Sequence, residues 1–160
     1  MKTRTKVLLV TAAVALPAFA LGAGSPPGEA MWRAVWPWDT PAMHEPSAAQ
    51  VPFFMLLGVF EAVALGLAVA LLAFGRQAFA DRFGRNGAAA QACTAWLLGN
   101  WWVHDSLHIV NGEHYGGLLV IEYAFHVTLI AAAAYLALLV ARATGSVSRR
   151  PAPQPRPADA

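Results

Sequence analysis

Charged side chains and cysteine are both scarce in this sequence, and each scarcity excludes a class of protein. Only 12% of the 160 residues are charged, against about 25% in a typical soluble domain, which leaves little room for a large water-facing domain. The single cysteine, Cys93, excludes an internal disulfide and any CxxC metal motif. The net charge of +2 gives no argument for binding nucleic acid. What remains is a chain that is 58% hydrophobic.

The hydrophobic residues gather in four long runs, at residues 7–23, 52–74, 88–110 and 117–141. The last three contain 23 to 25 residues, enough to cross a hydrocarbon core about 30 Å thick at about 1.5 Å per residue. These runs lack the alternation of apolar and polar residues that is typical of barrel strands. A membrane span must satisfy its backbone hydrogen bonds internally, which an α-helix does. We therefore expect an all-α fold, a polytopic membrane bundle of four transmembrane helices in one domain over residues 1–141.

The first run allows a second interpretation. Lys2, Arg4 and Lys6 precede it and small residues follow it, which also describes a secretory signal peptide. The run is somewhat long for such a peptide and the cleavage pattern is not sharp, so a retained helix is favoured. If the segment is cleaved, three spans remain.

The basic residues predict the topology. Ten of the eleven lie in the N-terminus, in the segment after the second run, or in the C-terminal tail: Lys2, Arg4, Lys6, Arg76, Arg82, Arg85, Arg142, Arg149, Arg150 and Arg156. With alternating spans these regions share one side, which the positive-inside rule makes cytoplasmic. We expect a multi-pass protein of the plasma membrane with both termini in the cytoplasm and residues 142–160 as a disordered cytoplasmic tail.

Two other segments have predictable roles at the membrane. Residues 24–51 are rich in proline and tryptophan, which suits an outer loop lying in the headgroup layer. In the second run, small residues recur at every fourth position, a pattern that favours close helix contact: Gly58, Ala62, Gly66 and Ala70. The sequence leaves open whether that contact is internal or with another subunit.

Ionisable residues lie inside the last three runs, all in the outer half. Counting from the outer ends, Glu61 lies roughly 14 Å deep, His104 and Asp105 roughly 8–9 Å, and His108 roughly 3 Å. On the same scale Glu122 lies roughly 8 Å deep and His126 roughly 14 Å. A charge at the bilayer centre costs about 2.5–3.5 kcal/mol, so these groups should turn inward and find partners.

The spacing of these residues predicts that they face one another. His104 and His108 are four residues apart, as are Glu122 and His126, so each pair shares a helical face. The six-residue turn at 111–116 makes the last two helices antiparallel neighbours. The two polar stripes should therefore meet at similar depth.

The favoured interpretation is a transition-metal site. His104, His108, Glu122 and His126 are the predicted ligands, with Glu61 as a further ligand or partner of a ligand. The segment 104–108 resembles the H-E-x-x-H helix of the zincins over five residues, with Asp105 in the place of Glu. Asp105 is thus the candidate catalytic residue, as a base or as the group that orients an imidazole. The nitrogen and oxygen donors favour Zn, Fe, Mn or Cu(II).

Two other functions remain open. Chains of Asp, Glu and His inside a membrane are typical of proton or ion relays, which would make this a transport or energy-coupling subunit. A hydrogen-bonded network that only fixes helix packing would instead suit an accessory subunit. Haem held by His104 and His126 is a weaker variant of the metal hypothesis.

The expected partners are the lipid bilayer and, in a homo-oligomer or larger membrane complex, other subunits. Whether the protein is an enzyme stays open.

Overall fold

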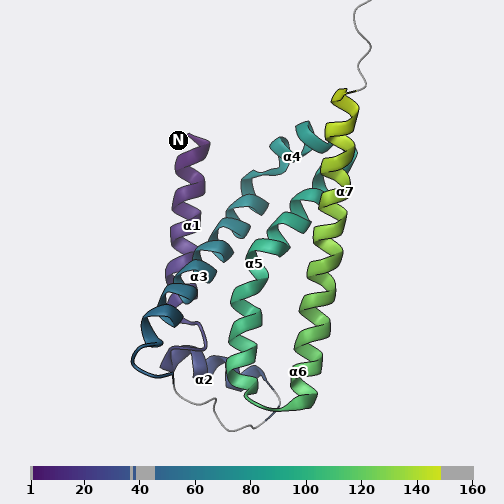
Figure 1. The fold of residues 1–160 in the computed structure, drawn as a ribbon. Helices are drawn as coiled ribbons and strands as arrows, with labels where there is room; N and C mark the ends of the chain where they lie inside the picture. Colours follow the sequence, from purple (N-terminus) through teal and green to yellow (C-terminus); the bar gives the residue numbers. More distant parts are fainter. Residues whose placement is uncertain (1, 37, 39–45, 149–160) are drawn as a thin grey trace, which may run out of the picture.

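The computed structural model describes residues 2–36, 38 and 46–148, and every element within them is a helix (Figure 1). In chain order these are α1 (Thr3–Ala20), α2 (Pro26–Val35), α3 (Val51–Phe74), α4 (Arg76–Phe83), the 3-10 turn η1 (Gly84–Asn86), α5 (Gly87–Asn111), α6 (Tyr115–Glu122), the π-helical turn η2 (Tyr123–Val127) and α7 (Thr128–Ser148). The all-α prediction is confirmed. The predicted tail falls partly outside the described residues, and α7 ends at Ser148, beyond the expected boundary at residue 141.

Three helical segments in the described part of the chain are long and apolar enough to cross a membrane: Thr3–Ala20, Val51–Phe74 and the continuous segment Tyr115–Gly145. They coincide with three of the four predicted spans. The remaining predicted span corresponds to α5, whose 25 residues are long enough but include Gln91, Asn100 and the polar residues near its end. These side chains lower its apolar character, so a fourth span stays a prediction.

The small residues of α3 pack against α1. Ala62 is buried in a cluster with Ala15 and Ala18, and a Cβ placed on Gly66 would collide with the backbone carbonyl of Thr11. Glycine is needed here because the two backbones approach each other closely. The contact that the sequence left open is therefore an internal one.

The segment after α1 contains a short helix that the sequence analysis did not predict. Ser25 caps α2 by accepting a hydrogen bond from the backbone N–H of Gly28 at 3.1 Å, and Pro26 occupies the first helical position. Trp32 is buried, packs edge-on against Trp102 of α5 and donates its indole N–H to the Leu21 carbonyl at 3.0 Å. These contacts hold α2 across one end of the bundle.

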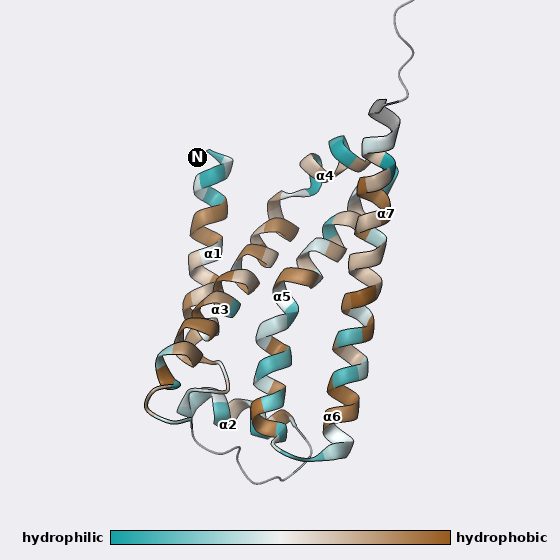
Figure 2. Ribbon diagram, in the orientation of Figure 1, coloured by the Kyte–Doolittle hydropathy of each residue, from teal (hydrophilic) through white to brown (hydrophobic). Residues whose placement is uncertain are grey.

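The two ends of the bundle differ in character. The N-terminus, α4 and the end of α7 lie at one end, while α2 and the α5–α6 connection lie at the other (Figure 1). Figure 2 shows hydrophilic residues at similar levels along α5 and along the helix formed by α6 and η2, in the half of the bundle nearer α2. The largest buried cluster lies in the same half, where Ala23, Trp32, Leu107, Val110, Ile121 and Phe125 pack together.

Candidate metal centre

A short, hydrogen-bonded turn joins the two helices that carry the polar residues. Gly112 has a φ of 53°, a conformation that glycine adopts readily. Asn111 is completely buried and donates its side-chain amide to the His114 carbonyl at 3.0 Å. Its side-chain oxygen accepts the indole N–H of Trp36 at 3.1 Å. This turn therefore sets the register in which α5 faces α6 and η2.

His114 has a structural role in starting α6. Its Nδ1 accepts a hydrogen bond from the backbone N–H of Gly117 at 2.9 Å, and Trp38 stacks on its ring at a centroid distance of 5.2 Å. The side chain thus satisfies one of the free N–H groups at the helix start.

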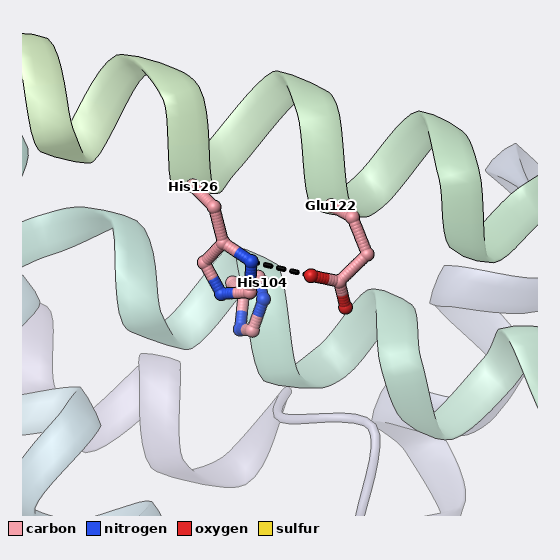
Figure 3. A group of neighbouring side chains, drawn as sticks. All are labelled: His104, Glu122 and His126. Atoms are coloured by element: carbon pink, nitrogen blue, oxygen red, sulfur yellow. Dashed lines mark ion pairs between the residues drawn. The ribbon is translucent and has the colours of Figure 1, made fainter.

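Beyond this turn, His104 of α5, Glu122 of α6 and His126 of η2 converge (Figure 3). One ligand atom from each residue can be chosen so that all three lie within 4.8 Å of one another. His126 Nδ1 contacts Glu122 Oε2, the interaction drawn as a dashed line in Figure 3. Two imidazoles and a carboxylate at this separation form a donor set that can hold a metal ion.

His104 is firmly held in this group. Only 7% of the residue is exposed, and its ring packs against Trp101 and Phe125. Its Nδ1 lies 2.6 Å from Asp105 Oδ1, so the Nδ1–H donates to the carboxylate and Nε2 keeps its lone pair as an acceptor or metal ligand. Metal-binding histidines usually donate their second ring N–H in this way, which fixes the tautomer and the orientation of the ring.

His108 extends the group on α5. Its Nε2 lies 3.1 Å from His104 Nε2 and 3.4 Å from Glu122 Oε1. Two donors bound to one tetrahedral zinc ion, each about 2.0–2.1 Å from it, lie roughly 3.3 Å apart. The distances from His108 Nε2 to His104 Nε2 and to Glu122 Oε1 are therefore close to the separation between two ligand atoms of a tetrahedral zinc site.

The helix that carries Glu122 and His126 is locally π-helical. The turn η2 covers residues Tyr123–Val127 and contains His126, and the Thr128 hydroxyl donates to the carbonyls of Ala124 and Phe125 at 2.7 and 3.0 Å. Single π turns inside α-helices are rare and occur frequently at functional sites. No feature of the sequence had indicated this turn.

The structure places the predicted site residues in two neighbouring sets. His104, Glu122 and His126 form the ligand group, and His108 contacts two of its members. Glu61 lies outside this group; its carboxyl interacts with that of Asp105, and both line a cavity between α1, α3 and α5. Asp105 therefore connects Glu61 with His104.

No family model, curated protein or solved structure matched this chain.

Proposed function

We propose that this chain is an integral membrane protein that binds a transition-metal ion through His104, Glu122 and His126, with His108 as a fourth ligand. The observation that carries the proposal is the convergence of three ligand atoms within 4.8 Å. Intramembrane His and carboxylate groups are costly and are usually functional. A divalent cation offsets the carboxylate charge while it uses neutral imidazoles.

The arrangement of the ends supports an outward-facing site. The N-terminus with Lys2, Arg4 and Lys6 lies at the same end as α4, which carries Arg76 and Arg82. The positive-inside rule makes that end cytoplasmic. The metal centre lies in the half nearer α2, so it belongs to the extracytoplasmic half of a plasma-membrane protein.

The donor set favours Zn, Fe, Mn or Cu(II), because imidazole and carboxylate are its only donors. Three protein ligands with an open position would suit catalysis, whereas a site closed by His108 would suit metal storage or transfer. In both cases Asp105 orients His104 through Nδ1. The protein would thus act in metal-dependent chemistry or in metal handling.

Metal analysis of the purified protein tests the proposal. We expect close to one equivalent of bound transition metal in the native chain and little in the His104→Ala and Glu122→Gln variants. Glu113→Gln is the matched control, because this carboxylate is exposed in the α5–α6 connection and its replacement should leave the metal content unchanged. Equal, substoichiometric metal in all four samples would reject the site and leave a hydrogen-bonded network that only fixes helix packing.

A proton relay is the second candidate, and a continuous series of contacts favours it. The series runs from Glu61 to Asp105, to His104, to His108 and on to Glu122, and such series of titratable groups are typical of relays. Reconstitution in liposomes separates the two candidates. A proton flux that persists in the presence of chelators and disappears in Glu61→Gln would favour the relay.

A further inference from the structure

A cavity beside the metal centre has walls that are mostly apolar. It has a volume of about 680 Å³, within the range of about 300–1,000 Å³ typical of small-molecule sites. Side chains from α1, α3 and α5 line it, among them Phe19, Phe54, Met55, Trp102 and Ile109, and leave it partly open to the outside. An occupant must therefore have a largely hydrocarbon body.

Three ionisable side chains line this cavity, together with Ser25 and Ser106. Glu61 and Asp105 lie there with their carboxyl groups interacting, and His108 lies next to them. The Oε1 atom of Glu61 is buried and has no hydrogen-bond partner among the described residues. Buried polar atoms are almost always hydrogen-bonded, so this carboxyl group keeps an unused acceptor, which reaches a ligand in the cavity once the side chain turns toward it.

The charged groups of the lining indicate what kind of head group fits. The carboxyl groups of Glu61 and Asp105 supply hydrogen-bond acceptors in a largely apolar setting, where a buried charged group needs a partner. Among the described residues, neither lysine nor arginine lines the cavity. An anionic head group would therefore meet only like charge, whereas a protonated amine would meet two acceptors.

From these observations we propose that the cavity binds an apolar molecule that carries one protonated amino group, held by Glu61 and Asp105. The proposal goes beyond the metal site and does not depend on it. His108 lines the cavity and also contacts His104 and Glu122. The amino end of the occupant would therefore lie next to the metal centre.

Photoaffinity labelling in phosphatidylcholine nanodiscs tests this. The probe is a dodecylamine that carries a diazirine in its chain, and the matched probes are the corresponding alcohol and carboxylic acid. We expect the amine to label peptides of α1, α3 or α5, to be displaced by unlabelled dodecylamine, and to label more strongly than either matched probe. Labelling should be the same with and without a chelator.

Three variants locate the binding site. Glu61→Gln should lower labelling by the amine roughly tenfold to hundredfold, the effect of losing a hydrogen bond to a charged group, and should leave the alcohol unaffected. Gly24→Leu should lower labelling by all three probes, because Gly24 lines the cavity and a Cβ there meets nothing within 4 Å. Glu113→Gln, at an exposed carboxylate of the α5–α6 connection, should change nothing.

The possible results separate the two proposals. Equal labelling by the three probes, or labelling unaffected by Glu61→Gln, would overturn the amine site and leave a surface that contacts lipid. Loss of amine labelling on chelation would also overturn it, because the ligand would then be held by the metal. Selective amine labelling in a protein that holds no metal would support the cavity and reject only the metal centre.

Discussion

At the scale of single residues, the side chains of the proposed metal centre are held unequally by their two helices. His104 is buried and fixed by Asp105 and Phe125, whereas the side chains of Glu122 and His126 are 42% and 45% exposed. A ring that is already oriented loses little rotamer freedom when a metal binds, and a half-exposed one loses more. The affinity should therefore depend strongly on the contacts that orient His104.

The first prediction concerns Asp105→Asn, which keeps the size of the side chain and removes its charge. The variant should still bind metal, but with an affinity lower by about 10- to 100-fold, the usual effect of changing the partner of a metal-binding histidine. Competition with a chromophoric chelator would measure the change.

Asp81→Asn provides the matched control, because Asp81 accepts a hydrogen bond from Gln77 on α4 at 2.7 Å and lies far along the chain from the centre. Its metal affinity should equal that of the native protein. Native affinity in Asp105→Asn as well would show that the contact with His104 Nδ1 does not tune the site.

Residue spacing predicted part of this site, and the reason is local geometry. The pairs His104–His108 and Glu122–His126 contact each other as their four-residue spacing indicated, and the short turn brings the pairs together. The position of Glu61 was not predictable in the same way. The predicted depth of Glu61 in the membrane matched that of the other ionisable groups. Which residue its side chain contacts depends on how α3 is rotated about its own axis, and the depth does not determine that rotation.

At the scale of the helices, the packing of α1 on α3 depends on the absence of a side chain at Gly66. Replacing Gly66 by leucine adds helix propensity worth up to about 1 kcal/mol. It also inserts a side chain where a Cβ alone would collide with the Thr11 carbonyl. Overpacking typically costs about 1–3 kcal/mol, so the collision should dominate.

We therefore expect Gly66→Leu to lower the thermal unfolding midpoint in detergent, followed by circular dichroism. Gly145→Leu is the matched control, since a Cβ at Gly145 meets nothing within 4 Å, and it should unfold at the native temperature or slightly above. If Gly66→Leu were as stable as this control, α1 would not pack closely on α3.

The bounds of α3 and α5 followed from the sequence because these apolar runs end where glycine and polar residues begin, whereas the runs 7–23 and 117–141 differ by several residues from α1 and from the end of α7. The predicted runs 52–74 and 88–110 correspond to α3 and α5 within one residue at each end. The helix α2 was missed although Ser25 and Pro26 form a recognisable start signal, because proline and tryptophan suggested an irregular interfacial loop. The π turn was missed because the residues that form it, Tyr123–Val127, carry no pattern that distinguishes them from an ordinary α-helix.

At the scale of the whole molecule, charge and polarity are separated along the bundle. Basic residues gather where the N-terminus, α4 and the end of α7 lie, and the ionisable residues of the metal centre lie in the opposite half (Figures 1 and 2). In a membrane this separation predicts the orientation of the chain, and with it the side on which the proposed metal centre would open. The orientation is testable without knowledge of the function.

The single native cysteine makes that test simple. In a Cys93→Ala background, one new cysteine is placed at Glu113, in the α5–α6 connection, or at Arg85, in η1, both of which are exposed. A membrane-impermeant maleimide added to intact cells should label Glu113→Cys at once, and should label Arg85→Cys only after the cells are permeabilised. The positive-inside rule predicts this labelling pattern, because η1 lies between the arginines of α4 and the start of α5, on the side expected to be cytoplasmic.

Two results would contradict the predicted topology. The reverse labelling pattern would place the proposed metal centre on the cytoplasmic side, and labelling of both positions in intact cells would contradict a span formed by α5.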